Sequence, residues 1–289
     1  AGCLHRDHTA SISSRHLGLV TAEDEALHNS NIAAMAGLIQ RYLDVDGLVS
    51  RLSSFKGHWE SQLNIQSVST TTQARVNIAI ARDQAFCFYY QDTLDLLEQA
   101  GCCLVPFSPI NDPTLPKGCS GLYLGGGYPE LHGQALTDNT SMRRAIRTFS
   151  EEGGVVYAEC GGFMYLLEEL TDRNGTPYAM CGALPGTSCM QERFQELGYR
   201  EVSTTRPSIL GDAVTVVRGH AFHYSQLTHM KEDLVSPIYK LRDKDGWMDR
   251  KEGFLKGNTL GSYVHLHFGG NPEVISHLVQ QCRDSEVIT

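Results

Sequence analysis

Short apolar runs alternate with amphipathic stretches along the middle of the chain. Four of these runs predict buried strands, at residues 75–81, 102–107, 121–124 and 155–159. Other segments carry apolar residues at helical spacing and predict helices, at residues 92–99, 137–152 and 163–170. Strands that alternate with helices in this way are typical of an α/β fold, in which a mostly parallel sheet is flanked by helices.

The two ends of the chain have different patterns. The last third predicts antiparallel strands followed by a helix, at residues 199–205, 213–224, 253–268 and 272–282. The first part predicts helices at residues 31–43 and 46–52, and a Ser- and Thr-rich stretch at residues 67–72 is typical of a linker. We therefore expect two domains, at residues 1–72 and 73–289.

The composition of the chain limits which partners it is expected to bind and in which cellular compartment it is expected to act. The chain has 24 Lys and Arg against 33 Asp and Glu, a formal net charge of −9, so we expect it to bind neither nucleic acid nor an anionic membrane surface. No run approaches the roughly 20 apolar residues that a membrane-spanning helix needs, and no secretory signal is visible. The nine cysteines are odd in number and lack a Cys-x-x-Cys pair. This pattern disfavours disulfides and structural zinc and favours the reducing cytoplasm.

The segment around Cys160 is the most informative for chemistry. A short apolar strand ends at Cys160, two glycines follow at once, and a helix begins, which is the pattern of a nucleophile elbow. The glycines remove side chains that would clash at such a turn, and a helix N-terminus favours the thiolate over the thiol. We therefore expect the pKa of Cys160 to lie below that of a free cysteine. A core cysteine packed beside glycines is the alternative interpretation.

A run of three glycines marks a second candidate segment. Residues 125–127 follow the strand predicted at residues 121–124, at the sheet edge where ligands collect in doubly wound folds. Glycines there let the backbone approach a substrate closely and donate N–H groups. The glycine spacing does not fit a phosphate-binding loop, since no Lys-Ser/Thr pair follows. Taken alone, such a run is more often a tight loop than a site.

Two pairs of histidines are candidates for the base that a cysteine nucleophile needs. His265 and His267 are two residues apart in a predicted strand, so their side chains share one face. His220 and His223 form the second pair. Four histidines and a cysteine could also ligate zinc, but no carboxylate-rich or paired-cysteine framing accompanies them. We therefore expect no bound metal.

These motifs occur together, and in order, in one known family. The matching stretches include ARDQAFCFYY, LYLGGGYPE, YAECGGFMYL, RGHAFHYS and SYVHLHF, together with the short VPFSP, at residues 81–90, 122–130, 157–166, 218–225, 262–268 and 105–109. They resemble the C-terminal glutamine amidotransferase domain of the cobyrinic acid a,c-diamide synthases, enzymes of cobalamin biosynthesis. Residues 15–20, RHLGLV, resemble the tail of the ATP-dependent ligase domain of that family.

The resemblance implies a class I glutamine amidotransferase-like (flavodoxin-like) fold and a two-site reaction. At the glutaminase site, a cysteine thiolate attacks the side-chain amide of glutamine and releases ammonia through a thioester. At the other site, ATP with Mg²⁺ activates the a and c acetates of a cobyrinate-like corrinoid, and ammonia then forms the amides.

The matching motifs assign roles to residues of this sequence. Cys160 corresponds to the nucleophile and His265 to its base, with His267 as the weaker candidate for that role. Backbone N–H groups of Gly126 or Gly127, with Gly161, correspond to the oxyanion hole. Other residues of these motifs are expected to face the corrinoid or the ligase domain rather than glutamine: Arg82, Asp83, Phe86, Phe88, Tyr89, Tyr90, His220 and His223.

The sequence also departs from the family pattern. Many glutamine amidotransferases have Glu two residues after the catalytic histidine, where this chain has His267, so the group that orients His265 is unassigned. Ala221 replaces a usual Glu. No loop of the Gly-rich, Lys-Ser/Thr type occurs, so we expect ATP to act in a ligase domain that this chain almost wholly lacks, supplied by a partner chain or by a longer protein. A homodimer is a further expectation.

Three interpretations of function therefore stay open. The first is the glutaminase part of a corrinoid amidotransferase that acts through Cys160. The second is a catalytically incomplete fragment, or a binding or regulatory module, that keeps the glutaminase fold. The third is a cysteine hydrolase of related architecture that acts on another amide. A nickel tetrapyrrole is an alternative to the corrinoid.

Overall fold

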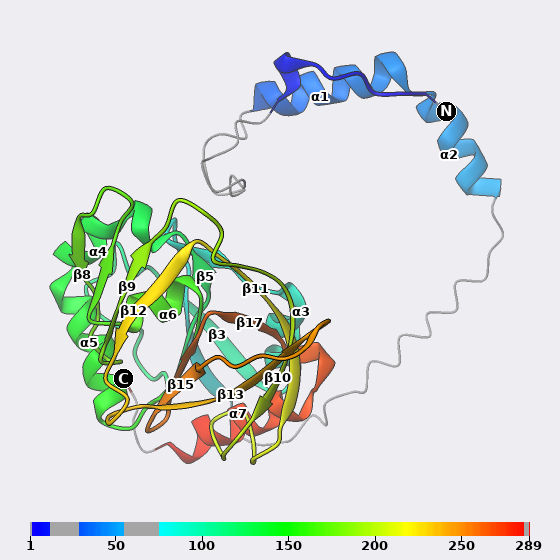
Figure 1. The fold of residues 1–289 in the computed structure, drawn as a ribbon. Helices are drawn as coiled ribbons and strands as arrows, with labels where there is room; N and C mark the ends of the chain where they lie inside the picture. Colours follow the sequence, from blue (N-terminus) through cyan, green and yellow to red (C-terminus); the bar gives the residue numbers. More distant parts are fainter. Residues whose placement is uncertain (1, 12–28, 55–74, 286–288) are drawn as a thin grey trace. The chain divides into compact units, whose positions relative to one another are not determined.

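A computed structural model describes residues 2–11, 29–54, 75–285 and 289. The chain divides into two compact units, at residues 1–66 and 67–289. In the described part of the first unit, the short 3-10 helix η1 (His8–Ala10) precedes the α-helices α1 (Asn29–Tyr42) and α2 (Val45–Ser54), as Figure 1 shows. Both helices predicted there are confirmed. The linker predicted at residues 67–72 lies outside the described residues.

The second unit contains a large mixed sheet, with eleven strands among the residues that the structure describes. Its parallel half has the order β3-β1-β4-β6-β16. These strands are β1 (Val76–Ala81), β3 (Cys102–Phe107), β4 (Gly121–Leu124), β6 (Val155–Glu159) and β16 (Thr259–Ser262). The four strands predicted between residues 75 and 159 are therefore confirmed, and they lie side by side as an α/β fold requires.

The antiparallel half continues from β16 in the order β15-β13-β10-β11-β17, and β14 pairs with β13. Its strands are β10 (Glu196–Thr204), β11 (Val216–His223), β13 (Ser236–Asp243), β14 (Gly246–Trp247), β15 (Glu252–Lys256) and β17 (Val264–His267). The predicted segment 253–268 forms three short strands, and Gly257, with a φ of +57°, allows the turn between the first two. The expected change from parallel to antiparallel pairing in the last third is confirmed.

Two smaller sheets complete the second unit. One has the order β12-β9-β7-β8 and contains β7 (Glu169–Thr171), β8 (Pro177–Ala179), β9 (Gly186–Met190) and β12 (Ser225–Met230). The other pairs β2 (Phe86–Phe88) with β5 (Gly126–Gly127) in antiparallel register. This second pairing fixes the position of the glycine run beside the carboxyl end of β4.

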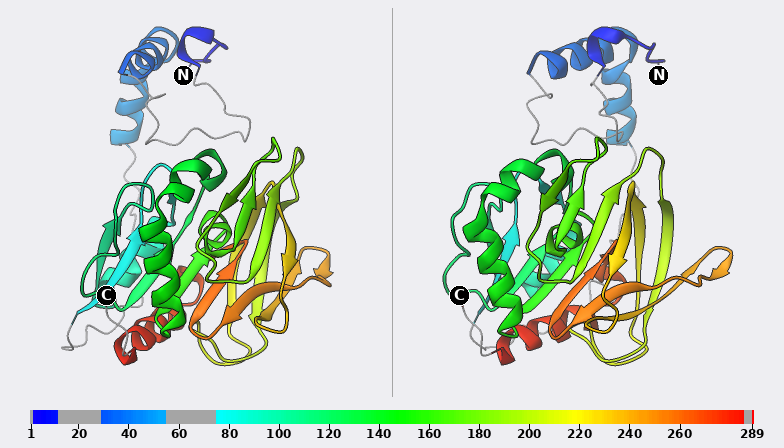
Figure 2. Two further views of the ribbon diagram at one scale, coloured as in Figure 1. Left: turned by 90° about the vertical axis from the view of Figure 1, so that its left-hand side faces the viewer. Right: turned by 60° about the vertical axis from the view of Figure 1, so that its left-hand side comes forward.

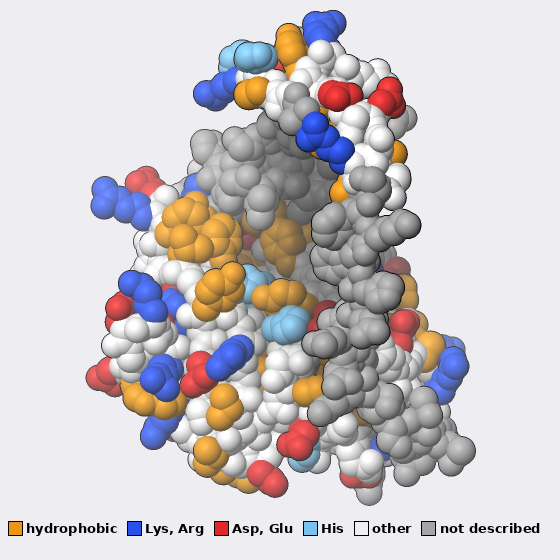
Figure 3. Space-filling model, turned by 90° about the vertical axis from the view of Figure 1, so that its right-hand side faces the viewer, with side chains coloured by type: hydrophobic (Ala, Val, Ile, Leu, Met, Phe, Trp, Pro, Cys, Tyr) orange, Lys and Arg blue, Asp and Glu red, His pale blue; other side chains and the backbone are white. Residues whose placement is uncertain are grey.

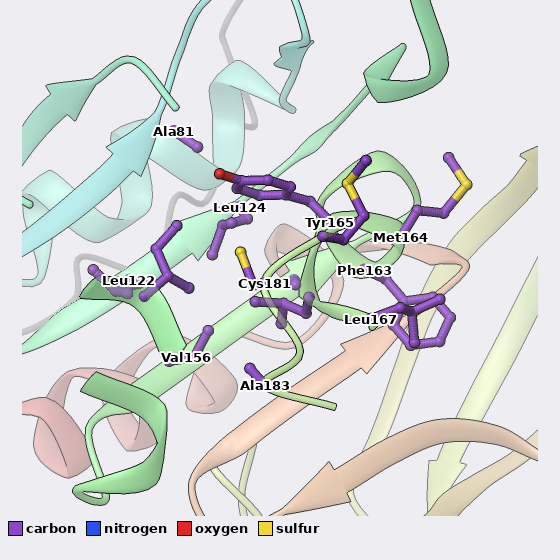
Figure 4. Packing of buried hydrophobic residues seen from close by; sticks show 14 of the residues in the cluster. Ala81, Leu122, Leu124, Val156, Phe163, Met164, Tyr165, Leu167, Cys181 and Ala183 are labelled. Carbon is purple, nitrogen blue, oxygen red and sulfur yellow. The ribbon is translucent and has the colours of Figure 1, made fainter. Parts of the chain in front are cut away.

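Helices cover both faces of the parallel strands, as the two views of Figure 2 show. Alternate residues of β1 belong to two separate hydrophobic cores, because successive side chains of a strand point to opposite faces. Ile78 packs with residues of α3 (Gln91–Gln99) and α7 (Glu273–Asp284). Ala81 belongs to the core that contains α5 (Thr140–Glu151) and α6 (Gly161–Leu166), part of which is drawn in Figure 4.

Two predicted helices differ from those observed. The helix predicted at residues 163–170 starts earlier and ends at Leu166, because Leu167 adopts an extended backbone and Leu170 pairs within β7. The helix predicted at residues 137–152 is divided into α4 (Gly133–Asp138) and α5 by Asn139, whose side chain accepts a hydrogen bond from the Met142 N–H and caps α5. Among the described residues, no helix has the length and apolar character needed to cross a membrane.

Candidate active site

Cys160 occupies a strained turn between β6 and α6. Its backbone has φ 45° and ψ −101°, a conformation that a residue with a Cβ adopts at a cost of about 1–3 kcal/mol. Two hydrogen bonds hold the turn: the Cys160 N–H donates to the Ser262 carbonyl at 2.8 Å, and the Met164 N–H donates to the Cys160 carbonyl at 2.9 Å. The predicted strand–turn–helix geometry is therefore present, with the cysteine at its tightest point.

The glycine run lies against both sides of this site. A Cβ added at Gly161 would lie 2.8 Å from the Gly127 nitrogen, and a Cβ added at Gly126 would lie 2.4 Å from Cε1 of His265. Both distances are shorter than real Cβ atoms allow, so these glycines are needed for close approach. Gly126 and Gly127 are adjacent, so one peptide unit spans the gap between His265 and the residue that follows Cys160. The structure therefore links Gly126 to His265 and Gly127 to Gly161, the residue after Cys160.

His265 comes from β17, far along the chain from Cys160. It is buried, pairs with His220 across the β11–β17 ladder, and stacks on the His220 ring with centroids 4.7 Å apart. Its Nδ1 lies 3.8 Å from Oε2 of Glu159. The carboxylate nearest to the histidine is therefore the residue that immediately precedes Cys160 in the sequence.

Glu159 is held in place from three directions. Its carboxyl group accepts hydrogen bonds from the Tyr157 hydroxyl at 2.5 Å, the Tyr123 hydroxyl at 3.1 Å and the Leu266 N–H at 2.8 Å. Burial raises the pKa of Glu159 to about 7, although these donors oppose the shift. Sequence reasoning missed this residue. The feature of the sequence that could have identified it is a Glu at the last position of a strand that is otherwise apolar and predicted to be buried.

Burial keeps both partners of the proposed reaction neutral in the free protein. It raises the pKa of Cys160 to about 12, assisted by the negative charge of Glu130 and opposed by the Gly161 N–H. It also lowers the pKa of His265 to about 3, with further contributions from His220 and His223. The expected low thiol pKa is therefore wrong for this structure. The physical reason is that α6 has only six residues, and its N-terminal field is weaker than the cost of burying a thiolate.

A second buried carboxyl group lies close to the thiol. Glu130 is in the 3-10 helix η2 (Pro129–Leu131), which follows the glycine run and contacts α6. The side chain is buried, and its charge is the second-largest contribution to the pKa of Cys160. Sequence reasoning placed Glu130 within a family motif without giving it a role, because sequence alone does not reveal that its carboxylate is buried.

Two residues predicted to face the corrinoid or the ligase domain are buried instead. Phe86 is fully buried in the core, where its ring lies 5.3 Å from that of Tyr165. His223 is also buried, and its Nδ1 and Nε2 lie 2.8 and 3.4 Å from a Ser225 carbonyl and a Glu196 carboxylate. Phe86 has no surface to offer a partner, so the prediction is corrected for it, and His223 is buried in the wall of a cavity that Arg250 and Tyr263 also line.

Two further residues of that set organise the loop after β1. Asp83 accepts hydrogen bonds from the Ala85 N–H at 2.8 Å and the Ile110 N–H at 2.9 Å. The Tyr89 hydroxyl donates to the Ala81 carbonyl and accepts from the Gly125 N–H. Tyr89 therefore ties the start of the glycine run to the end of β1.

The other residues predicted to face the corrinoid or the ligase domain lie at or near the surface. Arg82 is exposed and Phe88 is partly buried. The Tyr90 hydroxyl lies 2.6 Å from Nδ1 of His220, and the Tyr90 ring packs edge-on against that of His267. Histidine and hydrophobic side chains lie side by side on the face shown in Figure 3.

His267 has surroundings unlike those of His265. Its Nε2 lies 3.0 Å from a carboxylate oxygen of Asp92 in α3, and both side chains are partly exposed. His267 therefore faces α3 near the surface, whereas His265 is buried and lies against Gly126. The described residues contain no group of three or more His, Cys, Asp or Glu side chains arranged to hold a metal ion.

Comparison with known proteins assigns the fold and the family. Residues 77–273 match the model of the CobB/CobQ-like glutamine amidotransferase domain. A protein of Synechococcus sp. named cobyrinate a,c-diamide synthase is 40% identical over 293 residues, which cover 100% of this chain and 62% of that protein. The protein of the same name from Dehalococcoides mccartyi is 38% identical over 282 residues, which cover 96% and 60%. The chain thus spans about three fifths of the length of these relatives.

A solved structure agrees on the fold. PurLQS from Thermotoga maritima superposes with a TM-score of 0.50 at 13% identity, covering 73% of this chain and 98% of that one. At this identity the similarity concerns the fold alone. It agrees with the predicted architecture, an α/β amidotransferase-like fold in which helices flank parallel strands and the C-terminal strands are antiparallel.

Proposed function

Because the chain belongs to the CobB/CobQ-like glutamine amidotransferase domain family, we propose that it hydrolyses glutamine and delivers the ammonia to a second reaction. One observation carries the proposal. Gly126 lies against a buried histidine, His265, and the adjacent Gly127 lies against Gly161, which directly follows a cysteine at a strained strand-to-helix turn. Acyl transfer from an amide needs a nucleophile, a base that takes up its proton and a group that orients the base; a cysteine, a histidine and a carboxylate can fill these roles.

The reaction starts from a neutral pair. Cys160 Sγ attacks the side-chain carbonyl carbon of glutamine and transfers its proton to His265 as the carbon–sulfur bond forms. Burial opposes a free thiolate, so we place proton transfer together with the attack rather than before it. Glu159, 3.8 Å from His265 Nδ1, stabilises the imidazolium that results and fixes the orientation of the ring.

The intermediate then collapses with loss of ammonia. Its oxyanion is stabilised by backbone N–H groups of Gly161 and of Gly126 or Gly127, which line the same turn. His265 returns the proton to the leaving nitrogen, which departs as ammonia and leaves a γ-glutamyl thioester on Cys160. Water, deprotonated by the same histidine, attacks the thioester carbon; the carbon–sulfur bond breaks, glutamate is released, and His265 returns the proton to the Cys160 sulfur.

We also propose that the acceptor is a cobyrinate-like corrinoid whose a and c carboxylates become amides. The names of the two relatives support this proposal. We propose that ATP and Mg²⁺ act in a ligase part outside residues 73–289, and that residues 1–72 belong to its tail. The acceptor side is the surface around Tyr90 and His220. Tyr199, 87% exposed and paired with His220 across β10 and β11, extends this surface and was not predicted.

Ammonia release from glutamine by the purified chain tests the glutaminase proposal. We expect the unaltered chain to produce ammonia and glutamate in equal amounts, and Cys160→Ala to produce neither. Ammonia release that Cys160→Ala retains would remove Cys160 from the mechanism. If the unaltered chain is inactive even with an added ligase partner, the interpretation as a binding or regulatory module would replace this proposal.

A further inference from the structure

Glu130 is a buried carboxyl group without a partner. It is 9% exposed, and neither carboxylate oxygen has a hydrogen-bond partner in any other described residue, so that only the N–H of Glu130 itself opposes the rise of its pKa through a hydrogen bond. Arg173 influences its pKa from a distance, but Arg173 is exposed and lies over the ring of Tyr224, 5.0 Å from its centroid. Buried polar groups are nearly always paired, so an unpaired carboxylate indicates a missing partner.

The position of Glu130 indicates where that partner lies. The η2 helix packs against α6, and Pro129 Cδ would lie 3.1 Å from a Cβ at Gly161. After burial, the negative charge of Glu130 is the main cause that raises the pKa of the Cys160 thiol. The carboxylate is therefore beside the proposed glutaminase centre, on the side of the residue that follows the nucleophile.

The chemistry of the site specifies the missing partner. An unpaired carboxylate that is buried costs several kcal/mol, and a cation that donates hydrogen bonds to both oxygens removes this cost. Glutamine carries one cationic group, its α-ammonium, which a short aliphatic chain separates from the amide that Cys160 attacks. We propose that Glu130 binds the α-ammonium group of the substrate glutamine and so selects an amino acid over other primary amides. This inference rests on the proposed glutaminase function.

Substrate pairs separate this role from a structural one. Glutaramate has the amide and the carboxylate of glutamine but no amino group. We expect the 289-residue chain to prefer glutamine over glutaramate in kcat/KM, and Glu130→Gln to reduce that preference about 10- to 100-fold by loss of one charge-assisted hydrogen-bonding partner. The loss specific to glutamine should appear mainly in KM, whereas any effect of the substitution on the pKa of Cys160 acts on both substrates alike and leaves their ratio unchanged. Replacement of the exposed Glu192 by Gln is the matched control and should alter neither substrate.

The outcomes distinguish this inference from the function on which it rests. If Glu130→Gln lowers kcat/KM equally for both substrates, Glu130 acts in folding or proton transfer and the inference is wrong. If the preference for glutamine is unchanged, the inference is also wrong, and the glutaminase function stands. If the unaltered chain, and Cys160→Ser examined by calorimetry, neither hydrolyse nor bind glutamine, both proposals fail together.

Discussion

Glu159 Oε2 lies 3.8 Å from His265 Nδ1, although 105 residues separate the two in the sequence. The strand that ends at the proposed nucleophile thus also supplies the carboxylate that faces the proposed base. This arrangement answers the question raised by His267, which occupies the position where many glutamine amidotransferases have a glutamate. The carboxylate is present in space, but it comes from β6 instead of β17.

We predict that Glu159→Gln lowers kcat for glutamine hydrolysis by about 100-fold, because the imidazolium loses its countercharge. Burial raises the pKa of Glu159 to about 7 in the free protein, so wild-type kcat should rise with pH as this carboxyl group loses its proton. Under the proposal that Glu130 pairs with bound glutamine, the rise at saturating glutamine reports on Glu159. Steady-state rates between pH 5 and 9 check both statements. A Glu159→Gln variant that keeps the wild-type pH profile would contradict the positioning role.

We predict that Gly126→Ala abolishes most of the activity without unfolding the protein. The added methyl group would lie 2.4 Å from His265 Cε1, so the ring must move away from the thiol, and a loss of about 100-fold or more is expected. Gly270→Ala is the matched control, because a Cβ there meets nothing within 4 Å. Equal activities of the two variants would show that His265 does not need its observed position.

We predict that Glu130→Gln changes the pH dependence of stability. Burial raises the pKa of Glu130 from 4.5 to about 7 on folding, so the folded protein binds this proton more tightly than the unfolded chain. The associated stability is fully present below pH 4.5 and lost as the pH rises through 7. Relative to wild type, the free energy of unfolding of Glu130→Gln should therefore increase by up to about 3 kcal/mol between pH 4.5 and pH 8. Denaturant unfolding of both proteins at several pH values measures this difference. A difference in the free energy of unfolding that does not change with pH would contradict the raised pKa of Glu130.

We predict that Cys160 reacts slowly with small alkylating reagents in the absence of substrate, because burial favours its protonated form. The exposed Cys3 should react first. An electrophile shaped like glutamine should instead modify Cys160, and free glutamine should compete with it. Peptide mapping after a short exposure to the alkylating reagent gives the order in which the cysteines react. Rapid labelling of Cys160 by a small reagent would indicate that the thiol is ionised and would contradict this prediction.

The sequence predicts the strands and the elbow well, because both depend on local patterns. The apolar runs of β1, β3, β4 and β6 are bounded by polar or glycine residues, and Cys160 with its glycines has few conformations open to it. The end of α6 was misplaced because Leu170 satisfies helical spacing and strand pairing equally, and only its ladder with β8 and β9 decides between them.

The parts of the site that were missed depend on tertiary contacts. The partnership of Glu159 with His265 arises from the packing of β17 beside β6, which no local pattern reports. The thiol pKa of Cys160 depends on burial and on the charge of Glu130, and both depend on tertiary packing, such as the contact between η2 and α6. Phe86 belongs to a motif of the family, but its role there is to fill the core.

Trapping of the acyl intermediate tests the central claim most directly. The chain is mixed with glutamine, quenched in acid within the first turnovers, digested and analysed by mass spectrometry. We predict that the peptide containing Cys160 gains the mass of one γ-glutamyl group and loses it on treatment with hydroxylamine. Glutamine turnover with the adduct on another cysteine, or with none at all on Cys160, would contradict the account.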